Sequence, residues 1–133
     1  MGSLAREKLA VELFRRYEGN PILTYKDWPY PVNAVFNPAA TAFDGGVLLL
    51  CRVENMRGFS HLTCARSKDG LKNWVIDEKP TMEPDRTINE DVWGLEDPRI
   101  VWLEEQQQYA VTYVTFNEGG PTVSLAITKS FET

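Results

Sequence analysis

Two copies of one pattern of short β-type runs make up most of the sequence, and this repeat constrains the fold more than any other feature. Asn37-Pro38 matches Asp97-Pro98 at an offset of 60 residues, and Ala65-Arg66-Ser67 matches Ala126-Ile127-Thr128 at an offset of 61. Each copy has the same order of strand, turn, strand, hairpin and strand. No helical pattern interrupts the two copies. The repeat therefore predicts an all-β fold of two similar antiparallel sheets.

Glycine-rich turn signals separate the expected strands. The first copy has four strands and the second has three, over residues 39–43, 47–53, 61–67, 74–77, 99–103, 109–116 and 122–128. A β repeat of about 60 residues with four strands is typical of a β-propeller blade rather than of a solenoid coil. We therefore expect about two propeller blades.

The chain is too short for a closed ring of such blades. A propeller needs at least about four blades, or roughly 240 residues at this period, and the chain has 133 residues. We expect residues 20–133 to be the first two blades of a truncated domain in a longer protein. The second blade would keep an unpaired edge and an uncovered apolar face, which predicts a homo-oligomer.

A short α-helix is expected before the blades, within residues 1–19. The apolar residues of 4–17 lie among charged ones with the spacing of an amphipathic helix, and Gly19-Asn20-Pro21 ends the pattern. This segment lacks the uninterrupted apolar core of a secretory signal, and no stretch approaches the roughly 20 apolar residues of a membrane span. The sequence therefore predicts a cytoplasmic protein with no membrane partner.

Composition and charge exclude two further kinds of site. The net charge of -5 argues against a nucleic-acid surface as the main partner. His61 is the sole histidine, and it has no second histidine or carboxylate at ligand spacing. The sequence therefore predicts no metal site.

Residues 47–53 and 61–67 are expected to form a hairpin, and the position of its centre decides to which face of the sheet each side chain points. If its centre lies between Arg57 and Gly58, Cys51 is directly opposite Cys64, and we expect both thiols to be reduced core residues. Arg52 and Arg66 then leave opposite faces of the sheet, so only one of them faces a ligand. We prefer Arg52 for that face, with Arg66 as a structural cation that bridges two blades.

The stretch Trp93-Gly94-Leu95-Glu96-Asp97-Pro98-Arg99-Ile100 is a candidate acid site. It places two adjacent carboxylates, a proline and an arginine at the start of a β run. Pro98 is expected to bias Asp97 towards an extended backbone. The alternative is a turn that ends in a salt bridge between Asp97 and Arg99.

Asn37 and Asp97 occupy the same place in the repeat, at the start of the first strand of each blade. In a propeller those strands line the central channel, so both side chains could reach one ligand. The alternative for Asn37 is a hydrogen bond from one blade to the next.

Several motifs, taken in order along the chain, resemble glycoside hydrolase family 130, the β-mannoside phosphorylases and their relatives. The similarity runs from about Leu13 to Thr133. It is carried by Arg16-Tyr17 through Asn20-Pro21-Ile22-Leu23, Asn33-Ala34-Val35-Phe36-Asn37-Pro38-Ala39, Leu50-Cys51-Arg52-Val53-Glu54, Ser60-His61-Leu62, Ala65-Arg66-Ser67 and Trp93-Gly94-Leu95-Glu96-Asp97-Pro98-Arg99.

The resemblance implies a five-bladed propeller that cleaves β-linked mannosides with inorganic phosphate. Inversion of the anomeric centre gives α-mannose 1-phosphate, and no metal or organic cofactor is needed. It implies that Asp97 is the general acid, acting through a sugar hydroxyl, and that Asn37 and Arg52 contact the substrate. Glu96, Arg66 and Arg99 are further candidates for substrate contacts. Most phosphate-binding groups would lie in later blades, so the isolated chain is expected to have little or no activity.

The chemistry of inversion agrees with a single catalytic carboxylate. Where phosphate is the nucleophile, no second carboxylate is needed as a base. Two alternatives stay open: a β-mannoside hydrolase on a similar frame, which would use water and a carboxylate base, and a sugar-binding or structural propeller fragment without turnover.

Overall fold

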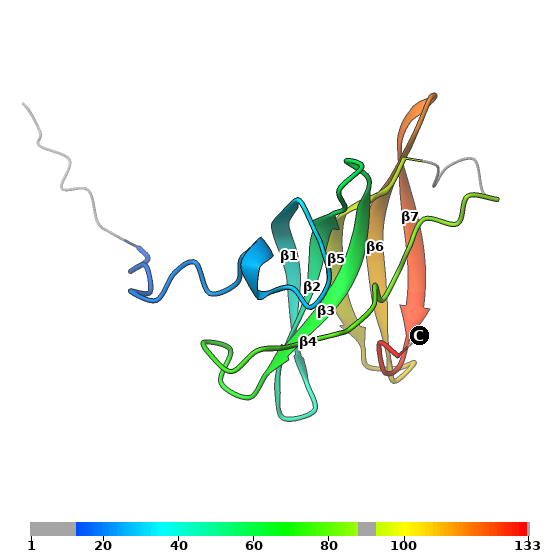
Figure 1. Ribbon diagram of the computed structural model, residues 1–133. Helices are drawn as coiled ribbons and strands as arrows, with labels where there is room; N and C mark the ends of the chain where they lie inside the picture. The colour runs from blue at the N-terminus through cyan, green and yellow to red at the C-terminus, as the bar shows by residue number, and fades with distance from the viewer. Residues whose placement is uncertain (1–12, 88–92, 133) are drawn as a thin grey trace, which may run out of the picture.

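The structure is a computed structural model that describes residues 13–87 and 93–132 (Figure 1). These residues form an all-β fold with one short 3-10 turn, η1 (Tyr25–Asp27). The first sheet has the order β1 (Ala34–Phe43), β2 (Gly46–Glu54), β3 (Ser60–Ser67) and β4 (Val75–Ile76). The second sheet has the order β5 (Leu95–Leu103), β6 (Gln108–Asn117) and β7 (Gly120–Thr128). All strand pairs within the two sheets are antiparallel.

The seven expected strands are all present, but β1 and β5 begin earlier than the sequence predicted. In each of them the pairing register shifts, between Val35 and Pro38 in β1 and between Glu96 and Arg99 in β5. Such β-bulges interrupt the alternation by which a strand is recognised in a sequence. The residues before each bulge therefore did not look like part of the strand.

The predicted N-terminal helix over residues 4–17 lies mostly outside the described residues. Residues 13–17, which are described, are not helical. Leu13 and Phe14 are both exposed, so they do not pack on the sheets as an amphipathic helix would. No helix among the described residues is long and apolar enough to cross a membrane.

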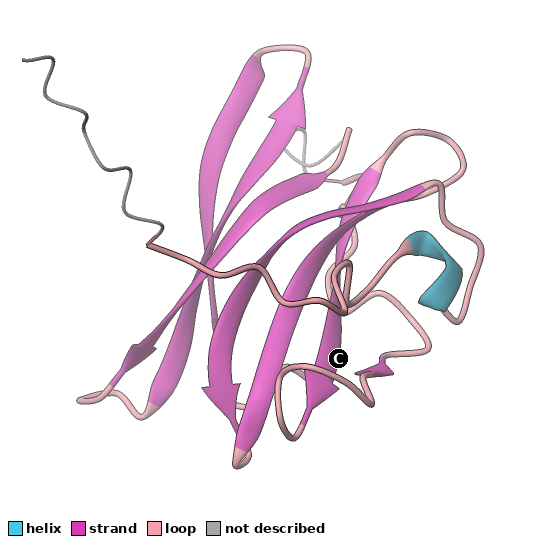
Figure 2. Ribbon diagram, turned by 90° about the vertical axis from the view of Figure 1, so that its left-hand side faces the viewer, coloured by secondary structure: helices cyan, strands magenta, loops and turns pink. Residues whose placement is uncertain are grey.

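The two sheets pack as twisted layers (Figures 1 and 2). A hydrophobic core lies between them. Leu48, Leu50, Leu62 and Cys64 of the first sheet meet Leu95 and Val111 of the second sheet in this core. β1 and β5, the first strands of the two sheets, lie against each other. The residues before β1 cover the opposite face of the first sheet, where Trp28 and Val32 pack on Leu49, Cys51, Val53 and Ala65.

The hairpin of β2 and β3 differs from the predicted register by one residue. Leu50, rather than Cys51, lies opposite Cys64. The loop is centred on Arg57 because the Asn55 side-chain oxygen accepts hydrogen bonds from the backbone N–H groups of Arg57 and Phe59, at 2.8 and 3.1 Å. A one-residue shift moves every side chain of one strand to the other face relative to its partner.

Two predictions were therefore wrong. Cys51 and Cys64 lie on opposite faces of the first sheet, each in a different core cluster. Both are buried free cysteines, as expected, and burial raises the pKa of the Cys51 thiol to about 12 and that of Cys64 to about 11. Arg52 and Arg66, which were expected on opposite faces, share one face because Arg66 pairs with Leu48, four residues from Arg52.

Candidate active site

The two bulges lie at matching places in the two sheets, and they position Asn37 and Asp97. Each bulge has a proline: Pro38 is the first residue that pairs after the shift in β1, and Pro98 lies within the shift in β5. A proline without an N–H is compatible with these positions because β1 and β5 are edge strands. Bulges turn a side chain away from its regular strand direction. The repeated Asn-Pro and Asp-Pro pairs thus place the side chains of Asn37 and Asp97 at matching bulges of the two sheets.

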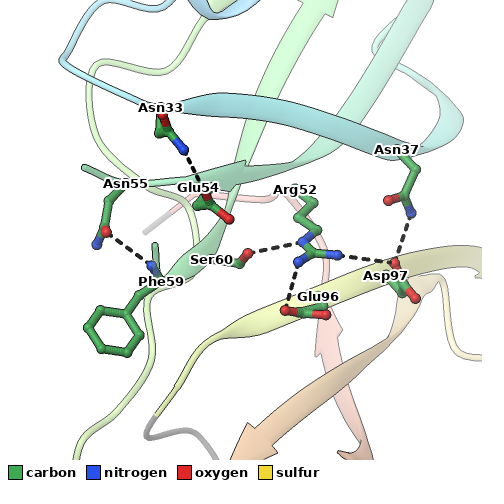
Figure 3. A network of polar contacts seen from close by, with 9 residues as sticks. All are labelled: Asn33, Asn37, Arg52, Glu54, Asn55, Phe59, Ser60, Glu96 and Asp97. Atoms are coloured by element: carbon green, nitrogen blue, oxygen red, sulfur yellow. Dashed lines mark hydrogen bonds and ion pairs between the residues drawn. The ribbon is translucent and has the colours of Figure 1, made fainter. Parts of the chain in front are cut away.

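Asp97 has a left-handed backbone, with φ 46°. The prediction that Pro98 holds Asp97 in an extended conformation was therefore wrong. Asp and Asn adopt this region more readily than other residues with a Cβ, but it still carries strain. The bulge holds Asp97 there, and its carboxyl Oδ1 accepts a hydrogen bond of 3.2 Å from Asn37 Nδ2 (Figure 3). Residues held in strained conformations often serve function.

Arg52 of β2 joins the two sheets at the same place (Figure 3). Its Nη2 lies 2.7 Å from Glu96 Oε1, and its Nη1 lies 3.9 Å from Asp97 Oδ1. Its Nε donates a 3.0 Å hydrogen bond to Ser60 Oγ. The guanidinium also stacks on Phe36, 4.8 Å from the ring centroid. The Arg52 side chain is thus held on several sides.

The charges of this cluster leave Asp97 as the more available carboxyl. Glu96 has the shorter contact with Arg52 and is 27% exposed, whereas Asp97 has the longer contact and is 51% exposed. One guanidinium thus faces two carboxyls through contacts of unequal length. The arrangement can present the Asp97 carboxyl to a ligand, next to the Asn37 amide that fixes its direction.

Arg66 lies apart from this cluster. It forms an ion pair with Asp77 and donates a 3.4 Å hydrogen bond to the Phe131 carbonyl oxygen, beyond the end of β7. It lines a hollow of about 600 Å³ with Phe43, Asp77, Lys79 and Phe131. In this position Arg66 links the two sheets. A structural cation of this kind was expected at Arg66 from the sequence.

Arg99 also lies outside the cluster. It is exposed, and its Nη1 donates a 2.9 Å hydrogen bond to the carbonyl oxygen of Pro98. The ion-pair partner of Asp97 is Arg52 and not Arg99. Four of the six candidate residues thus come together, namely Asn37, Arg52, Glu96 and Asp97. The hydrogen bond from Asn37 to Asp97 also joins the two sheets. It is therefore the kind of contact that the sequence left open as the alternative to a ligand contact by Asn37.

Sequence reasoning missed Ser60 and Phe36, both of which hold Arg52. Ser60 is 2% exposed, and in the observed register it pairs with Glu54, two residues from Arg52. The correct loop centre would have placed its hydroxyl beside the arginine. Phe36 precedes Asn37 inside the bulge, where alternation fails. Among residues 13–87 and 93–132, no group of three or more His, Cys, Asp and Glu could hold a metal ion.

The family model described as "beta-1,4-mannooligosaccharide phosphorylase" matches residues 6–133. The chain belongs to glycoside hydrolase family 130. Its resemblance to this family, inferred from the motifs, is thereby confirmed. No curated relative matches the chain.

Solved structures of family 130 proteins and related enzymes are similar to the chain. One comes from a study of family 130 mannoside phosphorylases and of the glycoside hydrolases among them that target β-1,2 mannosidic linkages in Candida mannan. It has 28% identity and a TM-score of 0.79, and the match covers 97% of this chain and 42% of that one. The β-1,2-mannobiose phosphorylase of Listeria innocua, in complex with β-1,2-mannobiose, has 25% identity and a TM-score of 0.75, with 89% and 48% covered.

A glycosyl hydrolase of Bacteroides ovatus has 26% identity and a TM-score of 0.75, with 90% of this chain and 39% of that one covered. The family 130 chain thus spans less than half the length of these solved structures.

Proposed function

We propose that this chain carries the acid-bearing part of the active site of a glycoside phosphorylase that acts on β-linked mannosides. The observation that carries the proposal is the cluster of Asn37, Arg52, Glu96 and Asp97, in which one hydrogen bond and two ion pairs join residues from three strands of two sheets. Asp97 is the general acid. We further propose that the two sheets are two blades of a five-bladed propeller, and that the strands β1 and β5 face its axis.

In the proposed reaction a phosphate oxygen forms a bond to the anomeric carbon of a β-mannoside, and the bond from this carbon to the leaving oxygen breaks. Attack from the face opposite the leaving group inverts the centre and gives α-mannose 1-phosphate. The proton of Asp97 passes to the leaving oxygen by way of a sugar hydroxyl, and Asp97 becomes a carboxylate. General acid catalysis of this kind contributes about 10²- to 10⁴-fold to the rate.

The neighbours of Asp97 have separate roles in this proposal. Asn37 donates through Nδ2, so its side-chain oxygen remains to accept a sugar hydroxyl. Glu96 takes the short contact with Arg52, at 2.7 Å, which leaves Asp97 with the longer contact of 3.9 Å and the more exposed carboxyl. Arg52 contacts both carboxyls and so holds Glu96 and Asp97 side by side.

Phosphate needs cations that this cluster does not offer. Arg52 is paired with Glu96, and Arg66 is paired with Asp77. Phosphate is held best by free arginine forks or lysines. We propose that these groups lie in parts of the family's length that this chain does not span. The chain alone would then show little or no turnover, unless copies associate.

A hydrolase is the second candidate, because one of the similar structures comes from work on family members that are glycoside hydrolases. Hydrolysis with inversion requires a carboxylate base about 6.5–9.5 Å from the acid, on the opposite face of the sugar. Glu96 is adjacent to Asp97 in β5 and is held by the same arginine. It is therefore a poor base, and a hydrolase would need a carboxylate base from a part of the family's length that this chain does not span.

Two measurements test the proposal. The first is a titration of the isotope-labelled chain with β-1,4-mannobiose and β-1,2-mannobiose, followed through the side-chain amide signals of Asn37. We expect shifts with a mannobiose, no shifts with the glucose disaccharide cellobiose, and loss of the response in Asp97→Ala. Equal responses to cellobiose, or none to either mannobiose, would contradict a mannoside site.

The second measurement is product analysis with and without phosphate. A trace of α-mannose 1-phosphate that appears only with phosphate, and that Asp97→Asn abolishes, supports the phosphorylase. Free mannose without phosphate supports the hydrolase. Rapid phosphorolysis by the monomeric chain would refute the claim that the phosphate groups lie elsewhere.

A further inference from the structure

One close backbone contact joins the two sheets beside the Arg52 cluster. Ser60, the first residue of β3, forms an isolated parallel bridge with Gly94, which lies directly before β5. A Cβ atom on Gly94 would lie 2.8 Å from the Ser60 nitrogen and 2.9 Å from the Ser60 oxygen. Gly94 also has φ +140°, which other residues rarely adopt. Only glycine therefore allows the sheets to approach this closely here.

Both partners of this contact are fixed within their own sheets. Ser60 pairs with Glu54 of β2 and is almost fully buried. The Gly94 carbonyl oxygen accepts a 3.3 Å hydrogen bond from the backbone N–H of Phe116 in β6. The contact between Ser60 and Gly94 therefore sets the distance between the sheets at this end of the core.

The same serine also orients the arginine. The Ser60 hydroxyl accepts the hydrogen bond from Arg52 Nε. Because a guanidinium is planar and its donors form a fixed fork, a bond at Nε decides where both Nη groups point. Here they point to Glu96 and Asp97, which follow Gly94 by two and three residues. One contact thus determines both sides of the ion-pair cluster.

We propose that Ser60 is a positioning residue of this site, and that it acts together with Gly94. Its hydroxyl fixes the direction of the Arg52 guanidinium, and its backbone fixes the distance to β5. Together they hold Asp97 within reach of Asn37. The role of Asp97 as an acid rests on the proposed function. The positioning of Arg52 and Asp97 by Ser60 does not depend on a reaction.

The test is an NMR comparison of Ser60→Ala with Ser67→Ala in the whole chain. Ser67 is a matched control, since it is a buried serine of the same strand whose hydroxyl instead bonds the Lys72 carbonyl oxygen at 2.6 Å. In Ser60→Ala we expect the Arg52 Nε–H to exchange with water about tenfold faster or more, as loss of a hydrogen bond to a charged group predicts. We also expect the Asn37 side-chain amide signals to shift, although Ser60 does not touch Asn37.

A merely structural serine would not produce this pattern. If Ser60→Ala leaves the Arg52 and Asn37 signals as they are in Ser67→Ala, the positioning role is refuted. Gly94→Ala provides a second route, because it widens the contact without removing the hydroxyl. It should shift the Asn37 amide signals as well, and unchanged signals in a folded Gly94→Ala chain would also count against the proposal.

These readouts separate the two proposals. If the Arg52 and Asn37 signals respond as expected but no mannobiose binds, the positioning role stands and the proposed function fails. If a mannobiose binds equally well to the wild type and to Ser60→Ala, with unchanged Arg52 exchange, the function stands and the positioning role fails.

Discussion

Matching positions of the two sheets differ sharply in burial, although the strands that carry them are alike. Leu62 and Cys64 of β3 are 0% exposed, whereas their counterparts in β7, Val123 and Leu125, are 74% and 62% exposed. The β3 residues belong to the core between the two sheets, whereas the β7 residues lie outside this core and are exposed. The comparison teaches that a strand's pattern makes a face apolar, but that only a neighbouring layer makes that face a core.

Truncation of one leucine in each sheet should give the largest difference in stability between the two sheets. Leu62→Ala removes a side chain from the centre of the core and is expected to lower the free energy of unfolding by about 3 to 4 kcal/mol. Leu125→Ala makes the same chemical change on the exposed face and should cost about 0.5 kcal/mol or less. Chemical denaturation of both variants checks this, and equal losses would show that the β7 face is covered in solution.

Acid should destabilise the first sheet through His61, whose counterpart in β7 is Thr122, a residue that does not titrate. Burial lowers the pKa of His61 from 6.5 to about 4, and the ring lies 3.0 Å from the Tyr30 hydroxyl. Because the unfolded chain binds this proton first, the free energy of unfolding should fall as the pH drops from about 6.5 to about 4. The loss attributable to His61 should be about 2 to 3 kcal/mol.

The measurement is the pH dependence of unfolding in the wild type and in His61→Gln. The carboxylates contribute equally to both proteins, so the difference between the two curves isolates the histidine. Parallel curves over this pH range would mean that His61 is accessible to protons in the folded chain.

The hairpin loops offer a smaller contrast between the sheets. The side-chain oxygen of Asn55 accepts two backbone hydrogen bonds in the β2–β3 loop, whereas that of Asn117, before the β6–β7 loop, accepts one, from Gly119 at 2.7 Å. Asn55→Ala should therefore cost about 1 kcal/mol or slightly more, and Asn117→Ala about half as much. Thermal unfolding of the two variants measures this, and a larger loss for Asn117→Ala would reverse the order.

A charge on the exposed face should have the smallest effect on stability. Leu125→Lys is expected to change the free energy of unfolding by about 0.5 kcal/mol or less, because the side chain already meets water. It should nevertheless reduce association between copies of the chain, since Val123, Leu125 and Ile127 form one apolar face. Light scattering over a range of concentrations tests this. Unchanged association would place the contact between copies elsewhere.

The sequence predicted the strands and the repeat because both follow from local chemistry. Alternation of apolar residues and turn glycines are read within a few residues. The motif around Asp97 could also be read locally, and it identified the family. The register of β2 and β3 could not be read in this way, because two hydrogen bonds from the backbone N–H groups of Arg57 and Phe59 to the Asn55 side-chain oxygen decide the centre of the loop. That shift of one residue changed which arginines share a face.

By itself, the sequence determined an all-β chain with two like sheets and placed an amide and a carboxyl at equivalent points of them. The tertiary structure alone decided that Asn37 and Asp97 meet at 3.2 Å, that Arg52 rather than Arg66 joins them, and that Ser60 holds that arginine. The reason is physical. Bulges and the approach of two layers aim these side chains, and both depend on contacts between residues far apart in the chain.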